Sequence, residues 1–149
     1  MKQIINKFRK LLFFSGVFNI VLALPLVFPV LYEKYFRLLW TVNQFLALGG
    51  KELIPPKEGI HALLINTAGI DLVLIGVIVL YSGFDPIKRR FIQFANAVGR
   101  MAFAVIIIYY VMVMDIARLV LIIGGIDVAI SVGFCYYLIM LRNPDKIDA

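Results

Sequence analysis

The sequence is poor in the side chains that bind metals, form disulfides or act as catalytic bases. It has a single cysteine, Cys135, and a single histidine, His61. One cysteine cannot form an internal disulfide or a CxxC pair, and a zinc or haem site would need further Cys or His ligands. Ser131 has no histidine available as a base, so a catalytic triad is not expected. We therefore predict no catalytic residue, no metal site and no cofactor.

Charged residues are scarce as well. They make up 16% of the 149 residues, whereas hydrophobic residues make up 62%. The mean hydropathy is +0.95. A soluble domain has roughly 25% charged and 45–50% apolar residues. This composition predicts an integral membrane protein with too little chain outside the membrane for a separate soluble domain.

Four apolar runs are long enough to span a membrane, since a spanning helix needs about 20 residues. They cover residues 11–32, 60–82, 91–114 and 119–141. In the long first loop, residues 35–48 have an amphipathic pattern typical of an interfacial helix, with Trp40 as an anchor. We predict an all-α fold: one transmembrane domain over residues 1–149, a four-helix bundle with an amphipathic interfacial helix in the first extracytoplasmic loop.

The distribution of basic residues predicts the topology. Nine of the 15 lie outside the spans on the side of the two termini, five lie on the other side, and Arg100 lies within a span. The positive-inside rule then places both termini in the cytoplasm. The net charge of +6 is not joined by a basic helix or a stacking motif, so we expect membrane lipids, not nucleic acid, as partners. A bacterial inner membrane is the expected location.

Two spans contain a carboxylate within the same tripeptide. The second span contains Gly69-Ile70-Asp71 and the fourth contains Gly125-Ile126-Asp127. A carboxylate at bilayer depth costs roughly 2.5–3.5 kcal/mol on insertion scales, so it is rarely present without a partner or a function. The repeated tripeptide also indicates an internal repeat of two hairpins, with chance similarity as the alternative, because Gly and Ile are common in membrane helices.

The depths of the polar residues predict one shared cluster. At about 1.5 Å of rise per residue, four side chains fall near the bilayer centre: Asn19, Asp71, Arg100 and Asp127. Residues expected to line the same site are Asn66, Thr67, Asn96, Tyr109 and Ser131. Two carboxylates and one guanidinium leave one negative charge unmatched, so one Asp would be protonated or a cation would visit the site.

A family resemblance accompanies these polar residues. Its motifs are Phe18-Asn19 in the first span, Asp85-Pro86 after the second, Gly99-Arg100 in the third and Asp127 in the fourth. With them the chain resembles a group of small four-span bacterial membrane proteins of unknown function, and in size and number of spans it is similar to the DoxX-like proteins. The resemblance implies a four-helix bundle and brings no established reaction. Asp71 has no counterpart in the pattern.

Three functions are consistent with the sequence. The first is a non-enzymatic subunit of a homo-oligomer or of a larger membrane complex, in which the polar cluster fixes the bundle. The second is the binding or transport of a lipid, quinone or other small amphiphile within the bundle. The third is an enzyme that acts on a lipid-soluble substrate, with Asp71 or Asp127 as acid or base.

Overall fold

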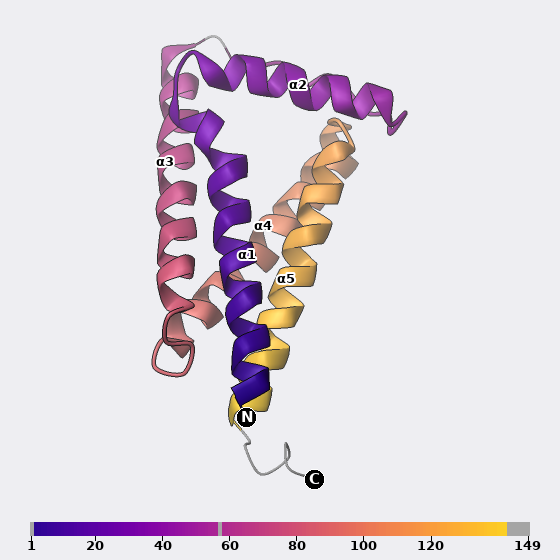
Figure 1. Cartoon of the computed structure of the whole chain (residues 1–149). Coiled ribbons are helices and arrows are strands. Elements are labelled where there is room, and N and C mark those ends of the chain that lie inside the picture. Colours follow the sequence, from indigo (N-terminus) through magenta and orange to yellow (C-terminus); the bar gives the residue numbers. More distant parts are fainter. Residues whose placement is uncertain (1, 57, 143–149) are drawn as a thin grey trace.

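The computed structural model describes residues 2–56 and 58–142 (Figure 1). These residues form five helices and no strand, which confirms the all-α prediction. The helices are α1 (Lys2–Val27), α2 (Leu31–Phe45), α3 (Gly59–Ser82), α4 (Arg90–Met114) and α5 (Leu119–Arg142). Four of them, all but α2, are long and apolar enough to cross a membrane. The structure therefore supports a multi-pass membrane protein with a helical bundle.

The first membrane helix differs in its bounds from the prediction. We predicted a span over residues 11–32, whereas α1 begins at Lys2 and ends at Val27. Proline has no N–H to continue a helical ladder and clashes with the preceding turn. Pro25 lies in the last turn of α1 and Pro29 follows it, so the chain turns there and α2 begins at Leu31. A helix is thus present where the interfacial helix was predicted, and it begins a few residues earlier than expected.

The membrane helices form two antiparallel pairs. Figure 1 shows α1 beside α3 and α4 beside α5, with the pairs meeting at the end that holds both termini and diverging toward the other end. Small residues bring α1 and α3 together: a Cβ added to Gly16 would lie 2.7 Å from the backbone oxygen of Gly76. Since lipid-facing helices associate mainly through such close packing, these glycines set the first pair.

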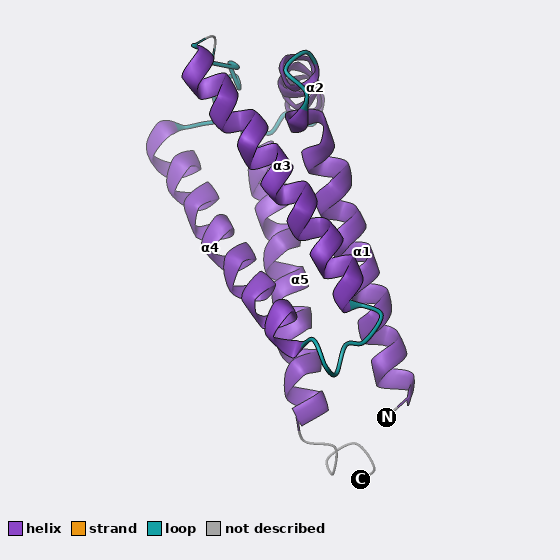
Figure 2. Cartoon of the chain, turned by 90° about the vertical axis from the view of Figure 1, so that its left-hand side faces the viewer, coloured by secondary structure: helices purple, strands orange, loops and turns teal. Residues whose placement is uncertain are grey.

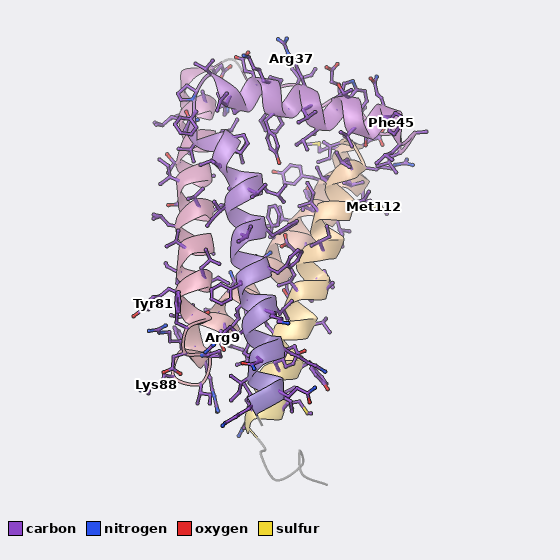
Figure 3. The ribbon with its side chains drawn as sticks, in the orientation of Figure 1. Arg9, Arg37, Phe45, Tyr81, Lys88 and Met112 are labelled. Atoms are coloured by element: carbon purple, nitrogen blue, oxygen red, sulfur yellow. The ribbon has the colours of Figure 1, made fainter. Side chains whose placement is uncertain are left out.

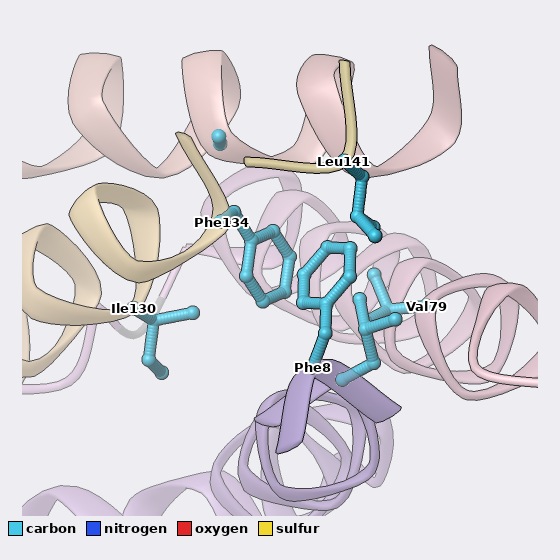
Figure 4. Close-up of a cluster of buried hydrophobic side chains, with 7 residues drawn as sticks. Phe8, Val79, Ile130, Phe134 and Leu141 are labelled. Carbon is cyan, nitrogen blue, oxygen red and sulfur yellow. The ribbon is translucent and has the colours of Figure 1, made fainter. Parts of the chain in front are cut away.

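An apolar core joins the two pairs where they meet. Phe8 of α1 lies edge-on to Phe134 of α5, with ring centroids 5.8 Å apart, and stacks on Tyr137 at 5.1 Å. Figure 4 shows Phe8 and Phe134 beside Val79, Ile130 and Leu141. Aromatic pairs of this kind add roughly 0.5–1.5 kcal/mol beyond the area that they bury. The core therefore holds the two pairs together at the end of the bundle with the termini.

Charged side chains mark the two ends of the bundle. Figure 3 shows Arg9 and Lys88 at the end with the termini and Arg37 pointing away from the bundle at the opposite end. At the first end, the Arg9 guanidinium donates to the backbone oxygen of Gly83 at 3.1 Å, and Arg89 lies 3.5 Å above the ring of Tyr81. Charged and aromatic groups at both ends are typical of the two membrane boundaries.

Helix α2 crosses the open end of the bundle and ties the first pair to the second (Figures 1 and 2). Its Asn43 is only 1% exposed. The Asn43 amide nitrogen donates to the Gly49 oxygen at 3.0 Å, and its amide oxygen accepts from the Leu119 N–H at 2.9 Å. Asn43 therefore caps the first turn of α5 from another helix, a role that the sequence pattern did not indicate.

Replacement of Asn43 by alanine is expected to lower the free energy of unfolding by about 1–2 kcal/mol, because it removes a cap and leaves buried polar groups unpaired. Reversible unfolding in mixed micelles would measure the change. Thr41→Ala is the matched control, since the Thr41 hydroxyl is exposed and bonds only within its own helix. Equal stability of the two variants would contradict the capping role.

Candidate functional site

The polar centre of the bundle is built around Arg100, which is 5% exposed. Its Nη1 forms a hydrogen-bonded ion pair with Asp127. Its Nη2 donates to the Ser15 hydroxyl at 2.9 Å and to the Asn19 side-chain oxygen at 2.6 Å. Its Nε donates to the Asn96 side-chain oxygen at 3.0 Å. We call these five residues the Arg100 cluster; they come from α1, α4 and α5.

The geometry of the cluster follows from the chemistry of the guanidinium. Arginine carries N–H donors on three nitrogens and has no acceptor, so burial requires several oxygens around it. All three nitrogens of Arg100 have such partners. Ser131 supports the carboxylate side, because its hydroxyl bonds to the backbone oxygens of Asp127 at 2.8 Å and Ala97 at 3.1 Å. The cluster thus links the two helix pairs near mid-membrane.

Asp71 does not belong to this cluster, contrary to the prediction. Its side chain is exposed, and it forms no ion pair or hydrogen bond with another described residue. The reason is the rotation of α3 about its axis. Gly69 faces α1, and a Cβ added there would lie 2.8 Å from the Leu26 backbone. Two residues further along a helix is a turn of about 200°. Asp71 therefore points away from α1, and the cluster contains one carboxylate for its one guanidinium.

The residues predicted to line the site lie in different places. Asn96 is in the cluster, and Ser131 lies directly behind it. Asn66 instead donates to the backbone of α1 at 2.7 Å, and Thr67 bonds within α3 at 2.9 Å. Tyr109 is 57% exposed. Of these five residues, only Asn96 also lines a cavity that lies beside the Arg100 cluster.

A cavity of about 580 Å³ lies beside the Arg100 cluster, between the two helix pairs and below α2. Cavities that hold small ligands are roughly 300–1,000 Å³. Most of the wall is apolar, with Leu72 and Ile75 of α3 and Phe103 of α4, whereas α2 supplies Tyr35 and Leu39 as a roof. The polar part of the wall consists of Asn19, Asn96, Arg100 and Asp127.

The two asparagines give the cavity a defined hydrogen-bonding character. Because the guanidinium only donates, Asn19 and Asn96 must both present their oxygens to Arg100. Their amide nitrogens do not contact Arg100, and neither donates to another residue in the described part of the chain. Both side chains are half-buried in the cavity wall. The site therefore offers two N–H₂ groups to an acceptor oxygen.

The electrostatics of the cavity favour an uncharged occupant. Arg100 and Asp127 neutralise each other within the wall. In the roof, burial raises the pKa of the Tyr35 phenol above its ordinary value, so this group stays neutral. A full charge placed here would lose its hydration without gaining an opposite charge. Among the described residues, no three His, Cys, Asp or Glu side chains gather in a way that would hold a metal ion.

Comparison of the chain with protein-family models, with curated proteins and with solved structures gives no match. Four membrane-length helices are the part of the resemblance that the structure supports. Membership of the DoxX-like proteins or of the small four-span bacterial group stays a prediction.

The sequence pattern did not indicate the roof of the cavity. Residues of α2 were expected to lie in the membrane interface, and Tyr35, Phe36 and Leu39 instead face the space between the helix pairs. The signal was present in the amphipathic pattern of α2. That pattern identifies an apolar face but cannot say whether lipid or protein covers it.

Proposed function

We propose that this protein binds a small neutral amphiphile with a carbonyl-type oxygen in the cavity between its helix pairs. The observation that carries the proposal is the pair Asn19 and Asn96, which line a largely apolar space of about 580 Å³ and whose amide nitrogens donate to no described residue. A quinone, or a lipid with an ester carbonyl, has the complementary chemistry. Its acceptor oxygen would bind the two amides and its hydrocarbon part would contact the walls.

The Arg100 cluster gives this site a rigid polar wall. Arg100 is held by its ion pair with Asp127 and donates to both asparagines, so it fixes their side chains before a ligand binds. Preorganised donors lose little conformational freedom on binding. Acid–base catalysis by Asp127 is less favoured, because its carboxylate is engaged by the guanidinium.

Gly99→Leu is expected to weaken ligand binding at least about tenfold, because the added side chain would occupy the cavity. Gly99 lines the cavity, and a Cβ there meets no atom within 4 Å, so the variant should fold normally. Trp40 is the chain's one tryptophan, and it follows Leu39, which lies in the roof of the cavity. Saturable quenching of its fluorescence by a short-chain ubiquinone in nanodiscs would measure binding.

Gly125→Leu is the matched control, because a Cβ at Gly125 also meets no atom within 4 Å and this residue does not line the cavity. It should bind the quinone as the wild type does. Native mass spectrometry of protein purified from its host membranes would then identify retained molecules. Quenching that never saturates, or that is the same in the Gly99→Leu variant, would contradict the proposal.

A subunit of a membrane complex is the second candidate function, and it is compatible with ligand binding. The observation that favours it is the exposed position of Asp71 in a helix of membrane length.

For the topology, we propose that the end with both termini faces the cytoplasm of a bacterial inner membrane. The excess of basic residues at that end supports this orientation.

A further inference from the structure

Asp71 is a carboxylate in a membrane-length helix that has no partner elsewhere in the described bundle. It lies close to the midpoint of the 24-residue α3, and its side chain is exposed. The carboxylate has no ion pair or hydrogen bond with any other described residue, although all four membrane-length helices are described in full. A carboxylate that faces lipid at this depth costs roughly 2.5–3.5 kcal/mol. A contact outside this chain would offset that cost.

The surroundings of Asp71 form a continuous exposed face. Leu64, Thr67, Asp71 and Leu74 succeed one another along α3 at helical spacings of three or four residues, and all four are exposed. We call these four residues the Asp71 face. The Thr67 hydroxyl donates to the Leu63 oxygen of its own helix at 2.9 Å. Asp71 is thus an unpaired carboxylate within an apolar strip that points away from α1.

We propose that the Asp71 face binds a membrane-spanning helix of a different protein, one that carries a lysine or arginine near its midpoint. This proposal rests on the second candidate function and names the chemistry of its partner. It is independent of ligand binding in the cavity. In a low-dielectric medium a basic side chain gains most from an unpaired carboxylate, so charge complementarity selects the partner.

The described part of this chain has no free basic group that a second copy could bring to this face. Arg100 is the basic residue that lies within the membrane at this depth, and its three nitrogens are engaged inside the bundle. The other basic residues of the described chain lie toward the helix ends and in the connecting segments. In a two-fold dimer through this face, two carboxylates would meet and repel each other. The charge balance therefore favours a partner of different sequence.

The test is site-specific photo-crosslinking of the full chain in its host membranes. A photoreactive amino acid replaces Leu74, which is 53% exposed on the Asp71 face, with Asp71 either intact or changed to asparagine. We expect a crosslink to another membrane protein that has a basic residue near the middle of a span, and about tenfold less of it with Asp71→Asn. The control probe replaces Val132, which is 59% exposed on α5 and not on the helix that carries the Asp71 face.

Each remaining outcome overturns the proposal in a distinguishable way. A crosslink to a second copy of this chain would keep the subunit function and remove the foreign basic partner. Crosslinks to lipid alone would remove both. A partner crosslinked equally by the Asp71→Asn chain, or one without a basic residue in its spans, would show that the carboxylate does not select it. Thermal unfolding in detergent should be unchanged by Asp71→Asn, because the side chain bonds to no described residue.

Discussion

Replacement of Arg100 by methionine is expected to lower the free energy of unfolding by about 3–5 kcal/mol, the typical loss when one partner of a buried ion pair is removed. Asp127 is 5% exposed and would be left buried without its cationic partner. The oxygens of Asn19, Asn96 and Ser15 would also lose their donor. Methionine has a length similar to that of arginine and would fill much of the same volume. The loss of unfolding free energy would therefore come from the missing polar interactions more than from changed packing.

The double variant Arg100→Met with Asp127→Leu separates these effects. Without the carboxylate there is no unpaired charge, and an ion pair replaced by apolar residues of similar volume is often neutral in stability. We expect the double variant to recover at least half of the loss. Unfolding titrations of the two single variants, Arg100→Met and Asp127→Leu, and of the double variant in mixed micelles would make up a double-mutant cycle. A single Arg100→Met variant with wild-type stability would refute the central role of the cluster.

Gly69→Leu is the second large effect that we expect, a loss of about 3 kcal/mol or more from overpacking. A Cβ at Gly69 would lie 2.8 Å from the backbone carbon of Leu26 and 2.8 Å from the nitrogen of Val27. These are backbone atoms at the end of α1, so no side-chain rotation can make room. The helices would have to separate, and the Asn66 bond to the Leu26 oxygen would be lost with them.

Gly125→Leu is the control for this substitution too, because the glycine stands at the same place in the repeated Gly-Ile-Asp tripeptide yet faces open space. It should unfold like the wild type. The two variants are to be compared in the same micelles, with helix content followed by circular dichroism. If Gly125→Leu destabilises the chain as much as Gly69→Leu, the close approach of α1 and α3 does not explain the loss.

The sequence was sufficient to predict the class of fold. Apolar runs of about 20 residues can satisfy their backbone in lipid only as helices, so composition and run length predict membrane helices directly. The bounds of the first helix differ from the predicted span of residues 11–32, because two prolines interrupt the first apolar run and α1 ends at Val27. The two-hairpin repeat stays a prediction.

The candidate site was predictable in part. Depth along the helix comes from counting residues, and it placed Asn19, Arg100 and Asp127 at one level, where the structure brings them together. Depth does not give the direction in which a side chain points. Asp71 lies at a similar level and points the other way, because Gly69 turns its own side of α3 toward α1.

The repeated tripeptide illustrates the division between sequence and tertiary structure. The sequence by itself determined that this protein has four membrane-length helices and two carboxylates at bilayer depth, because hydropathy and residue spacing are local properties. Only the tertiary structure decided that Asp127 is buried against Arg100 and Asp71 is exposed. Rotation of a helix about its axis depends on which small residues its neighbour approaches, and no single helix contains that information.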